Sequence, residues 1–183
     1  MGQYYKVLIK DKKELKAYDI PRAYKLTEHS WCANTFCLSI VKELIDNPKR
    51  IAWVGDYAEL EDYKKFKLGT EPKELWGGKS LDKPLACKKP LKSLKEVCYL
   101  VNKTKKLFIN LGQYYEQSKI EFHWGDDALF PLSLLTAIGN GQGGGDYFSP
   151  VNLHLIGTWA FDEVYFSDIF PTNYQKLDVW FKE

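Results

Sequence analysis

Short runs of β-forming residues recur along this chain, whereas only two stretches repeat their apolar residues with the period of an α-helix. Parallel strands need a crossover connection of about a dozen residues or more, usually a helix. Two helices cannot supply such a crossover for every pair of strands. The pattern therefore predicts an α+β fold, with one mostly antiparallel sheet and about two helices packed on one face.

The expected elements can be placed along the whole chain. We expect strands at 3–10, 15–18, 51–54, 97–101, 106–111, 120–124, 153–166 and 178–181, a short extended piece at 24–27, helices at 31–46 and 128–138, and a short polar helix at 59–67. Ser30 is the expected N-cap of the first long helix, and Asn47 with Pro48 ends it. Residues 59–96 are rich in Pro and Gly. They are predicted to form an irregular basic insertion within a single domain covering 1–183.

Composition and charge exclude several classes of protein. No apolar run approaches the ~20 residues that a membrane span needs, and the first residues have no apolar signal core. The sequence therefore predicts a cytoplasmic protein that makes no membrane contact. The net charge of +2 conceals a segregation, since residues 83–106 hold eight Lys and one Glu, whereas residues 120–183 hold nine acidic residues and two Lys.

Two interpretations of this segregation remain open. The lysines could simply decorate a solvated loop. Alternatively, the protein could be dipolar, offering an anionic face to a basic partner or a basic loop to nucleic acid. Arg22 and Arg50 are the only arginines. Because base reading favours arginine, sequence-specific nucleic-acid binding is not expected.

The four cysteines form no Cys-x-x-Cys pair, and reduced thiols are expected. A zinc site would have to combine His29, Cys32 and Cys37, with no second ligand pair at zinc-finger spacing. The sequence therefore predicts neither a bound metal nor a cofactor.

Residues 139–147 are the most unusual stretch, with five glycines in the first seven positions. A phosphate-binding loop runs from a strand into a helix N-terminus. This one leaves the C-terminal end of the expected helix 128–138, and no Lys-Ser or Lys-Thr follows it. Asp146 at such a helix end would suit a cation, an amine or a basic side chain of a partner. The other interpretation is a flexible surface loop capped by an Asx turn.

Several polar residues near turns are candidates for binding. Asp56, Asp126 and Asp146 could hold a divalent metal or share a proton if the strand ends bring them together. His29 and His123 could act as general bases, or each could make one structural hydrogen bond. The candidate binding residues are His29, Trp31, Asp56, Tyr57, His123, Asp126, Gly143, Gly144, Gly145, Asp146 and Tyr147. No sequence pattern assigns a catalytic residue, and a binding protein is favoured over an enzyme.

Aromatic residues are the strongest bulk signal for binding, with six Trp, twelve Tyr and ten Phe. Tyr and Trp dominate the energetic centres of protein interfaces. Trp53, Trp124 and Trp159 fall in strand-like segments and are expected in the core. The tyrosines near turns are expected at the surface: Tyr4, Tyr5, Tyr57, Tyr114, Tyr115 and Tyr147.

Five sequence blocks, in this order, resemble a family of small proteins from gut bacteria and their phages. They are MGQYYK (1–6), YKLTEHSW (24–31), RIAWVGDYA (50–58), PLSLLTAIGNGQGGGDY (131–147) and GTWA (157–160). The resemblance spans most of the chain, with residues 59–96 outside it. It implies a mobile-element gene in a low-GC host, and it implies no activity, catalytic residue or cofactor.

Two functions are expected from these observations. The first is a phage or mobile-element accessory protein that contacts a host protein or ribonucleoprotein and inhibits a defence system, in the manner of an anti-CRISPR protein. In this interpretation the acidic C-terminal third would occupy a basic nucleic-acid channel. The alternative is a nucleotide- or signal-molecule-binding protein, or a metal-dependent hydrolase, that uses the glycine-rich loop and nearby carboxylates.

Overall fold

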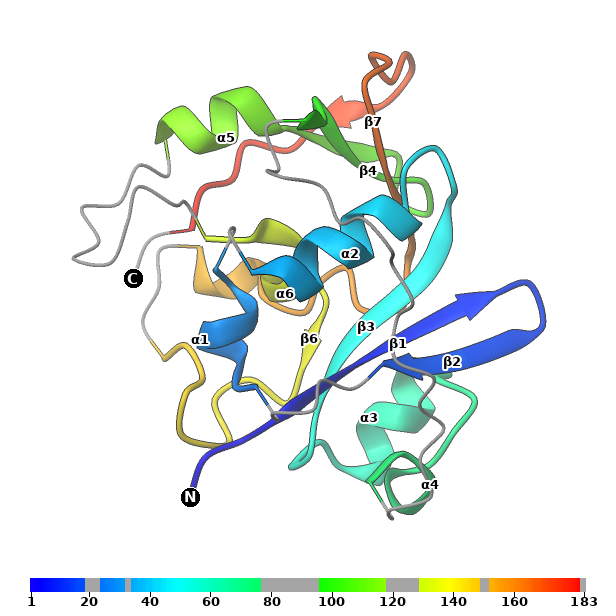
Figure 1. Ribbon diagram of the computed structural model, residues 1–183, viewed down its shortest axis with the longest axis vertical. Coiled ribbons are helices and arrows are strands. Elements are labelled where there is room, and N and C mark those ends of the chain that lie inside the picture. The colour runs from blue at the N-terminus through cyan, green and yellow to red at the C-terminus, as the bar shows by residue number, and fades with distance from the viewer. Residues whose placement is uncertain (19–23, 32–33, 77–95, 118–128, 149–151, 182–183) are drawn as a thin grey trace.

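The computed structural model describes residues 1–18, 24–31, 34–76, 96–117, 129–148 and 152–181, and Figure 1 shows how its elements are arranged. The strands are β1 (Tyr5–Asp11), β2 (Glu14–Tyr18), β3 (Lys49–Gly55), β4 (Tyr99–Asn102), β5 (Leu107–Asn110), β6 (Ala137–Ile138), β7 (Glu163–Ser167) and β8 (Gln175–Lys176). The helices are α1 (Leu26–His29), α2 (Thr35–Glu43), α3 (Leu60–Lys65), α4 (Pro72–Trp76), α5 (Leu111–Gln117) and α6 (Pro131–Leu135). The strand expected at 120–124 and most of the lysines expected in the basic insertion lie outside the described residues.

One sheet contains all of these strands. Its order is β2-β1-β3-β7-β4-β5-β8, and β6 pairs with β3 off this path. The longer strands pair antiparallel with one another, whereas the two-residue strands β6 and β8 pair in parallel with β3 and β5. This confirms the predicted fold class. Within the described residues, no helix is long and apolar enough to cross a membrane.

Alternating side chains of the central strand β3 enter two cores, one on each face of the sheet. Trp53 lies in the larger core with residues of α2 and α6. Val54 points the other way, into a smaller core that contains Tyr63 of α3 and Leu75 of α4. Figure 1 shows α2 and α6 on one side of β3 and α3 and α4 on the other. Helices thus cover both faces of this half of the sheet, whereas the sequence predicted helices on one face. The second face was not predicted because α3 and α4 are short and each buries a single residue.

The predicted helix 31–46 exists, but it begins later than expected. It covers Thr35–Glu43, and its N-cap is Asn34, whose side chain accepts a hydrogen bond from Phe36 N at 2.9 Å. Ser30 instead follows the single turn of α1, where its Oγ donates to Leu26 O at 2.7 Å. Ser30 therefore ends α1, and Asn34 caps α2 in its place.

Four other segments differ from the sequence-based expectation. Residues 24–27 bridge to β1 only at Tyr24 before the chain turns into α1. The expected helix 128–138 ends at Leu135, because the following residues pair with β3 as β6. The expected strand 153–166 is strand only from Glu163, and residues 178–181 form no strand, although Val179 and Phe181 are buried.

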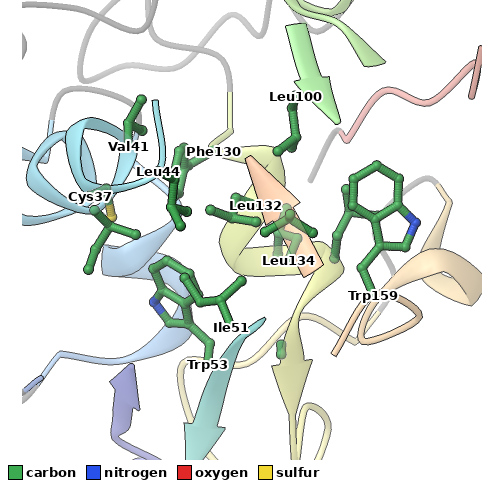
Figure 2. Packing of buried hydrophobic residues seen from close by; sticks show 14 of the residues in the cluster. Cys37, Val41, Leu44, Ile51, Trp53, Leu100, Phe130, Leu132, Leu134 and Trp159 are labelled. Atoms are coloured by element: carbon green, nitrogen blue, oxygen red, sulfur yellow. The ribbon is translucent and has the colours of Figure 1, made fainter. Parts of the chain in front are cut away.

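Two tryptophans anchor the larger core. Trp53 and Trp159 are 0% and 1% exposed, as the sequence predicted. The Trp53 ring lies edge-on to His29 and to Phe130, with centroid distances of 6.2 and 6.0 Å. Figure 2 shows Trp53 and Trp159 with Ile51, Leu132 and Leu134 filling the space between sheet and helices. Trp124 lies outside the described residues.

Replacing Trp53 should lower the free energy of unfolding far more than replacing an exposed tryptophan does. Trp53→Ala removes a fully buried ring and leaves a cavity, so the free energy of unfolding should fall by about 3–5 kcal/mol. Trp31 is 55% exposed, and Trp31→Ala should change that free energy by less than about 1 kcal/mol. Urea denaturation followed by circular dichroism measures both. Equal losses in the two variants would contradict this arrangement of the core.

Candidate functional site

The glycine-rich loop 139–147 is folded around its own aspartate. The backbone amides of Gly141, Gln142 and Gly143 donate to Asp146 Oδ2 at 3.0, 3.2 and 3.1 Å. Asn140 closes the base of the loop, because its side chain accepts from Tyr147 N and donates to Tyr147 O. The loop therefore has a defined conformation held by side chains, where the sequence favoured a flexible loop with an Asx turn.

The Asp146 carboxyl is buried, with 5% of the residue exposed. Its Oδ1 accepts from Tyr5 Oη at 2.9 Å. In the amide orientation that satisfies both its polar atoms, Gln3 Nε2 donates to Asp146 Oδ2 at 2.6 Å and to Gly139 O at 2.8 Å. Burial raises the pKa of the Asp146 carboxyl, while the loop amides and the Tyr5 hydroxyl lower it. Burial and the neighbouring Asp146 also raise the pKa of Tyr5.

The N-terminal segment is bound to the loop through its backbone. Gln3 N donates to Gly144 O at 3.0 Å, and Gly144 N donates to Met1 O at 3.1 Å. On the other side of the loop, Thr27 N of α1 donates to Gly145 O at 3.1 Å. The loop thus connects the chain start, β1 and α1, which are separated from it by more than 100 residues of sequence.

Two glycines are required where the chain packs against Gln3. A Cβ added at Gly143 would lie 2.4 Å from Gln3 Cβ, and one added at Gly55 would lie 1.9 Å from the side-chain amide group of Gln3. These contacts are shorter than any side chain permits. The two Gly-Asp-Tyr tripeptides, 55–57 and 145–147, therefore lie in the same region because both surround one buried glutamine.

Asp56 and Tyr57 are close to the loop but do not share a ligand site with Asp146. Asp56 Oδ1 accepts from Tyr4 N at 3.1 Å, and Asp56 N donates to Tyr4 O at 2.9 Å. The Tyr57 ring packs against the loop, since a Cβ at Gly143 would lie 3.1 Å from Tyr57 Cε2. Each carboxylate is used locally: Asp56 holds the start of β1, and Asp146 holds the loop.

His29 is buried in an aromatic environment. Its ring lies 5.7 Å from Tyr24 and 5.6 Å from Phe36, between ring centroids, and its Nε2 lies 3.3 Å from Tyr5 O. Cys37 Sγ donates to the His29 carbonyl. The side chain is 0% exposed, so its environment is that of a core histidine.

The structure brings most of the predicted candidate residues into one region. Residues 29, 56, 57 and 143–147 all belong to the loop or to the segments it contacts. Trp31, at the end of α1, is exposed. His123 and Asp126 lie outside the described residues. Of the predicted cluster of Asp56, Asp126 and Asp146, the structure describes Asp56 and Asp146.

The surface assignment of the tyrosines was wrong for three of the six. Tyr5, Tyr114 and Tyr147 are 2%, 1% and 3% exposed, because their rings belong to the larger core. Tyr5 and Tyr114 also hydrogen-bond inside the protein, Tyr114 to Leu129 O at 2.6 Å. Tyr4 is exposed, and Tyr57 and Tyr115 are half-buried.

Sequence reasoning missed two residues that organise this site. Gln3 and Tyr5 supply the two side chains that bind the buried carboxyl. Their position in the first block of the resemblance, MGQYYK, is the signal that could have identified them.

The geometry of the loop decides which ligands it can hold. Three converging amides form the kind of nest that binds phosphate in other proteins. Here the bound anion is the carboxylate of Asp146, so these donors are occupied from within. Among the described residues, no group of three or more His, Cys, Asp or Glu side chains is arranged to hold a metal ion. The arrangement offers an exposed, fixed loop tip at Gly141, Gln142 and Gly144.

Three of the five acidic residues that the structure describes in the C-terminal third form ion pairs within the protein. Asp162 pairs with Lys105 at 2.5 Å, and Glu163 pairs with Lys103 at 3.2 Å. Part of the segregated basic charge at 83–106 therefore neutralises part of the segregated acidic charge. Asp178 pairs with Lys176.

Comparison with family models, with curated proteins and with solved structures gives no match to this chain.

Removing the Asp146 carboxyl should release the loop. Asp146→Ala leaves the loop amides, Tyr5 Oη and the Gln3 amide without their acceptor, so the free energy of unfolding should fall by about 3 kcal/mol or more. Asp146→Asn keeps one oxygen for the amides and offers an NH₂ to Tyr5 Oη, and should cost roughly 1 kcal/mol. Urea denaturation measures both. A loss below about 1 kcal/mol for Asp146→Ala would show that the carboxyl does not hold the loop.

The stabilisation by Asp146 should depend on pH in a defined direction. Its folded pKa is raised, so the folded state binds the proton more tightly than the unfolded chain does. The stability gained from this group is then complete below the unfolded pKa of about 3.9 and declines as the pH rises through the folded pKa. The free energy of unfolding of the wild type, relative to Asp146→Asn, should fall from about pH 4 upward and then level off. A relative increase over that range would contradict the assigned environment.

Proposed function

We propose that this chain is a non-catalytic binding protein of a phage or mobile element, which inhibits a host defence system by protein–protein contact, in the manner of an anti-CRISPR protein. The contact surface is the face around the glycine-rich loop. One observation carries the proposal: the loop is held rigidly from inside by Asp146, while its tip and the large aromatic side chains of the segments bonded to it remain exposed.

Three exposed aromatic residues lie directly after the loop or in the segments whose backbone bonds to it, and they are called here the loop rim. Tyr4 follows Gln3, which bonds to Gly144, and it is 37% exposed. Phe148, directly after the loop, is 60% exposed, and Trp31, at the end of α1, is 55% exposed. Aromatic side chains of this kind dominate the binding energy of protein interfaces.

The fixed loop favours binding for an entropic reason. Glycine loses more backbone freedom than any other residue when it is ordered. Asp146, Gln3 and Asn140 order this loop already in the free protein. A partner that docks on it therefore does not have to order it, and preorganisation of this kind increases affinity.

The choice of a host defence component as partner rests on the resemblance of five sequence blocks to proteins of gut bacteria and their phages. The loop geometry disfavours the alternative, a nucleotide-binding protein or a hydrolase, because the amides that a phosphate would need are bonded to Asp146. The proposed partner is a host protein or ribonucleoprotein recognised through its protein surface.

The loop rim can be tested by capture from a bacterial host lysate and by a defence assay in the same host. The wild type, the double variant Trp31→Ser/Phe148→Ser and the matched control Leu153→Ser are immobilised in parallel. Leu153 is 42% exposed and belongs to the 3₁₀ turn Leu153–Leu155, outside the loop and the loop rim. The double variant should lose a captured host protein at least tenfold, a change of about 1.4 kcal/mol in binding free energy. In the defence assay it should lose protection of an invading phage, and the control should keep both.

Two outcomes would contradict the proposal. One is capture and protection that are unchanged in the double variant. The other is equal loss in the double variant and in Leu153→Ser, which would indicate a general effect on folding or solubility. Thermal unfolding of all three proteins separates this last case from loss of a specific surface.

A further inference from the structure

A second exposed apolar surface lies at the turn between β7 and β8, on a different part of the fold from the loop rim. Ile169 is 75% exposed and Phe170 is 57% exposed. They are consecutive, so their side chains project from one turn. Figure 1 shows this turn, in orange to red, at the opposite side of the molecule from α1.

Phe170 is held in place by other aromatic rings. Its centroid lies 5.8 Å from that of Tyr99 and 5.4 Å from that of Phe108, and Tyr99 and Phe108 contact each other at 5.9 Å. All three pairs are edge-to-face, with interplanar angles of 76–85° for the two pairs of Tyr99 and 75° for the third. Phe108 is only 4% exposed. Phe170 is therefore the outer member of a fixed aromatic cluster rather than a mobile side chain.

Hydrogen bonds fix the backbone of the same turn. Ser167 Oγ donates to Asp46 Oδ1 at 2.6 Å and accepts from Ile169 N at 3.2 Å. Asp168 Oδ1 accepts from Cys98 N at 3.0 Å. Thr172 N donates to Phe170 O at 3.0 Å. Exposed apolar residues on a rigid turn form a preorganised contact surface.

The charge beside Ile169 and Phe170 identifies the kind of partner. Asp46 and Asp168 flank Ser167, and neither forms an ion pair with a lysine or arginine in the part of the chain that the structure describes. This distinguishes Asp168 from Asp162, Glu163 and Asp178, which all do. The turn therefore presents an apolar tip above two carboxylates whose charge is not neutralised locally.

This charge argues against three other occupants. Nucleic acid and anionic lipid surfaces are negatively charged, so the two carboxylates would repel them. A second copy of the chain, docked through the same patch by two-fold symmetry, would bring the carboxylates of both copies together. A cationic protein surface with an apolar pocket complements both the tip and its charge.

We infer that the β7–β8 turn, with Ile169 and Phe170 at its tip and Asp46 and Asp168 at its base, docks into an apolar pocket rimmed by lysine or arginine on a partner protein. The inference rests on the proposed binding function, and it adds a second contact surface that recognises a basic partner. Phe170 supplies the buried aromatic anchor of this contact, and the carboxylates supply orientation and a faster encounter.

The test uses the full chain in four forms: wild type, Ile169→Ser, Asp168→Asn and the control Leu153→Ser. Ile169 is 75% exposed, so its replacement should leave folding unchanged. Asp168→Asn keeps an oxygen to accept the Cys98 amide and removes only the charge. Each form is immobilised and exposed to host lysate at about 0.05 M and about 0.5 M salt, where screening lengths differ several-fold. Captured proteins are then titrated in purified form.

The expected result has three parts. Ile169→Ser should weaken binding of a captured protein at least tenfold at both salt concentrations. Asp168→Asn should weaken it several-fold at low salt and scarcely at high salt. The captured protein should carry a basic surface, and Leu153→Ser should bind like the wild type.

The inference is overturned if no captured protein distinguishes Ile169→Ser from the wild type, or if Asp168→Asn has the same effect at both salt concentrations. It is also overturned if analytical ultracentrifugation shows self-association that Ile169→Ser abolishes, or if the wild type floats with phosphatidylserine vesicles through this turn. Failure here is distinguishable from failure of the proposed function. A partner lost in Trp31→Ser/Phe148→Ser but retained in Ile169→Ser would leave the loop rim as the binding surface.

Discussion

The buried carboxyl of Asp146 determines how the N-terminal half and the C-terminal half of this chain fit together. Its two oxygens accept from three loop amides, from Tyr5 of β1 and from Gln3 before β1. A charged group this well buried is tolerated only when its hydrogen bonds are complete. The glycines beside it follow from the same constraint, since Gly55 and Gly143 leave room for the Gln3 side chain that completes the set. The loop amides on the inside are bonded to Asp146, so only the outer side of the loop, with the loop rim beside it, remains for a partner.

Opposite charges that are far apart in the sequence of this protein lie close together in its fold. The basic stretch 83–106 and the acidic C-terminal third meet where the β4–β5 hairpin contacts the start of β7. The ion pairs Lys103–Glu163 and Lys105–Asp162 join them there. The carboxylates of Asp46 and Asp168, at the β7–β8 turn, form no ion pair with a lysine or arginine among the described residues. Recognition of a partner would accordingly depend on small apolar surfaces with a few nearby charges rather than on one long acidic face. Such surfaces have few energetically dominant residues.

The sequence predicted the fold class and the first five strands, because runs of β-forming residues bounded by turn residues are local signals. It misplaced the start of α2, since Asn34 and Ser30 are both good caps and only the formation of α1, which ends at Ser30, decides between them. It also placed Tyr5, Tyr114 and Tyr147 at the surface, because proximity to a turn does not reveal which rings pack into the core. For Tyr5, the buried partner Asp146 is 141 residues away. The sequence predicted a shared site only on the condition that Asp56, Asp126 and Asp146 meet; Asp126 lies outside the described residues, while the segments of Asp56 and Asp146 both surround Gln3. The physical cause of this arrangement, the burial of Gln3, cannot be read from local pattern, because it depends on pairing between the chain start and a distant loop.

Amide hydrogen exchange of the glycine-rich loop distinguishes a loop held from inside from one that is open to a ligand. If Asp146 accepts the amide protons of Gly141, Gln142 and Gly143, these three exchange slowly in the wild type despite their exposed position, and they become fast in Asp146→Ala. Adding inorganic phosphate should leave their exchange unchanged, because the carboxylate already occupies the nest. Rapid exchange of these amides in the wild type, or protection that appears only with phosphate, would contradict this description of the loop and of the surface it presents.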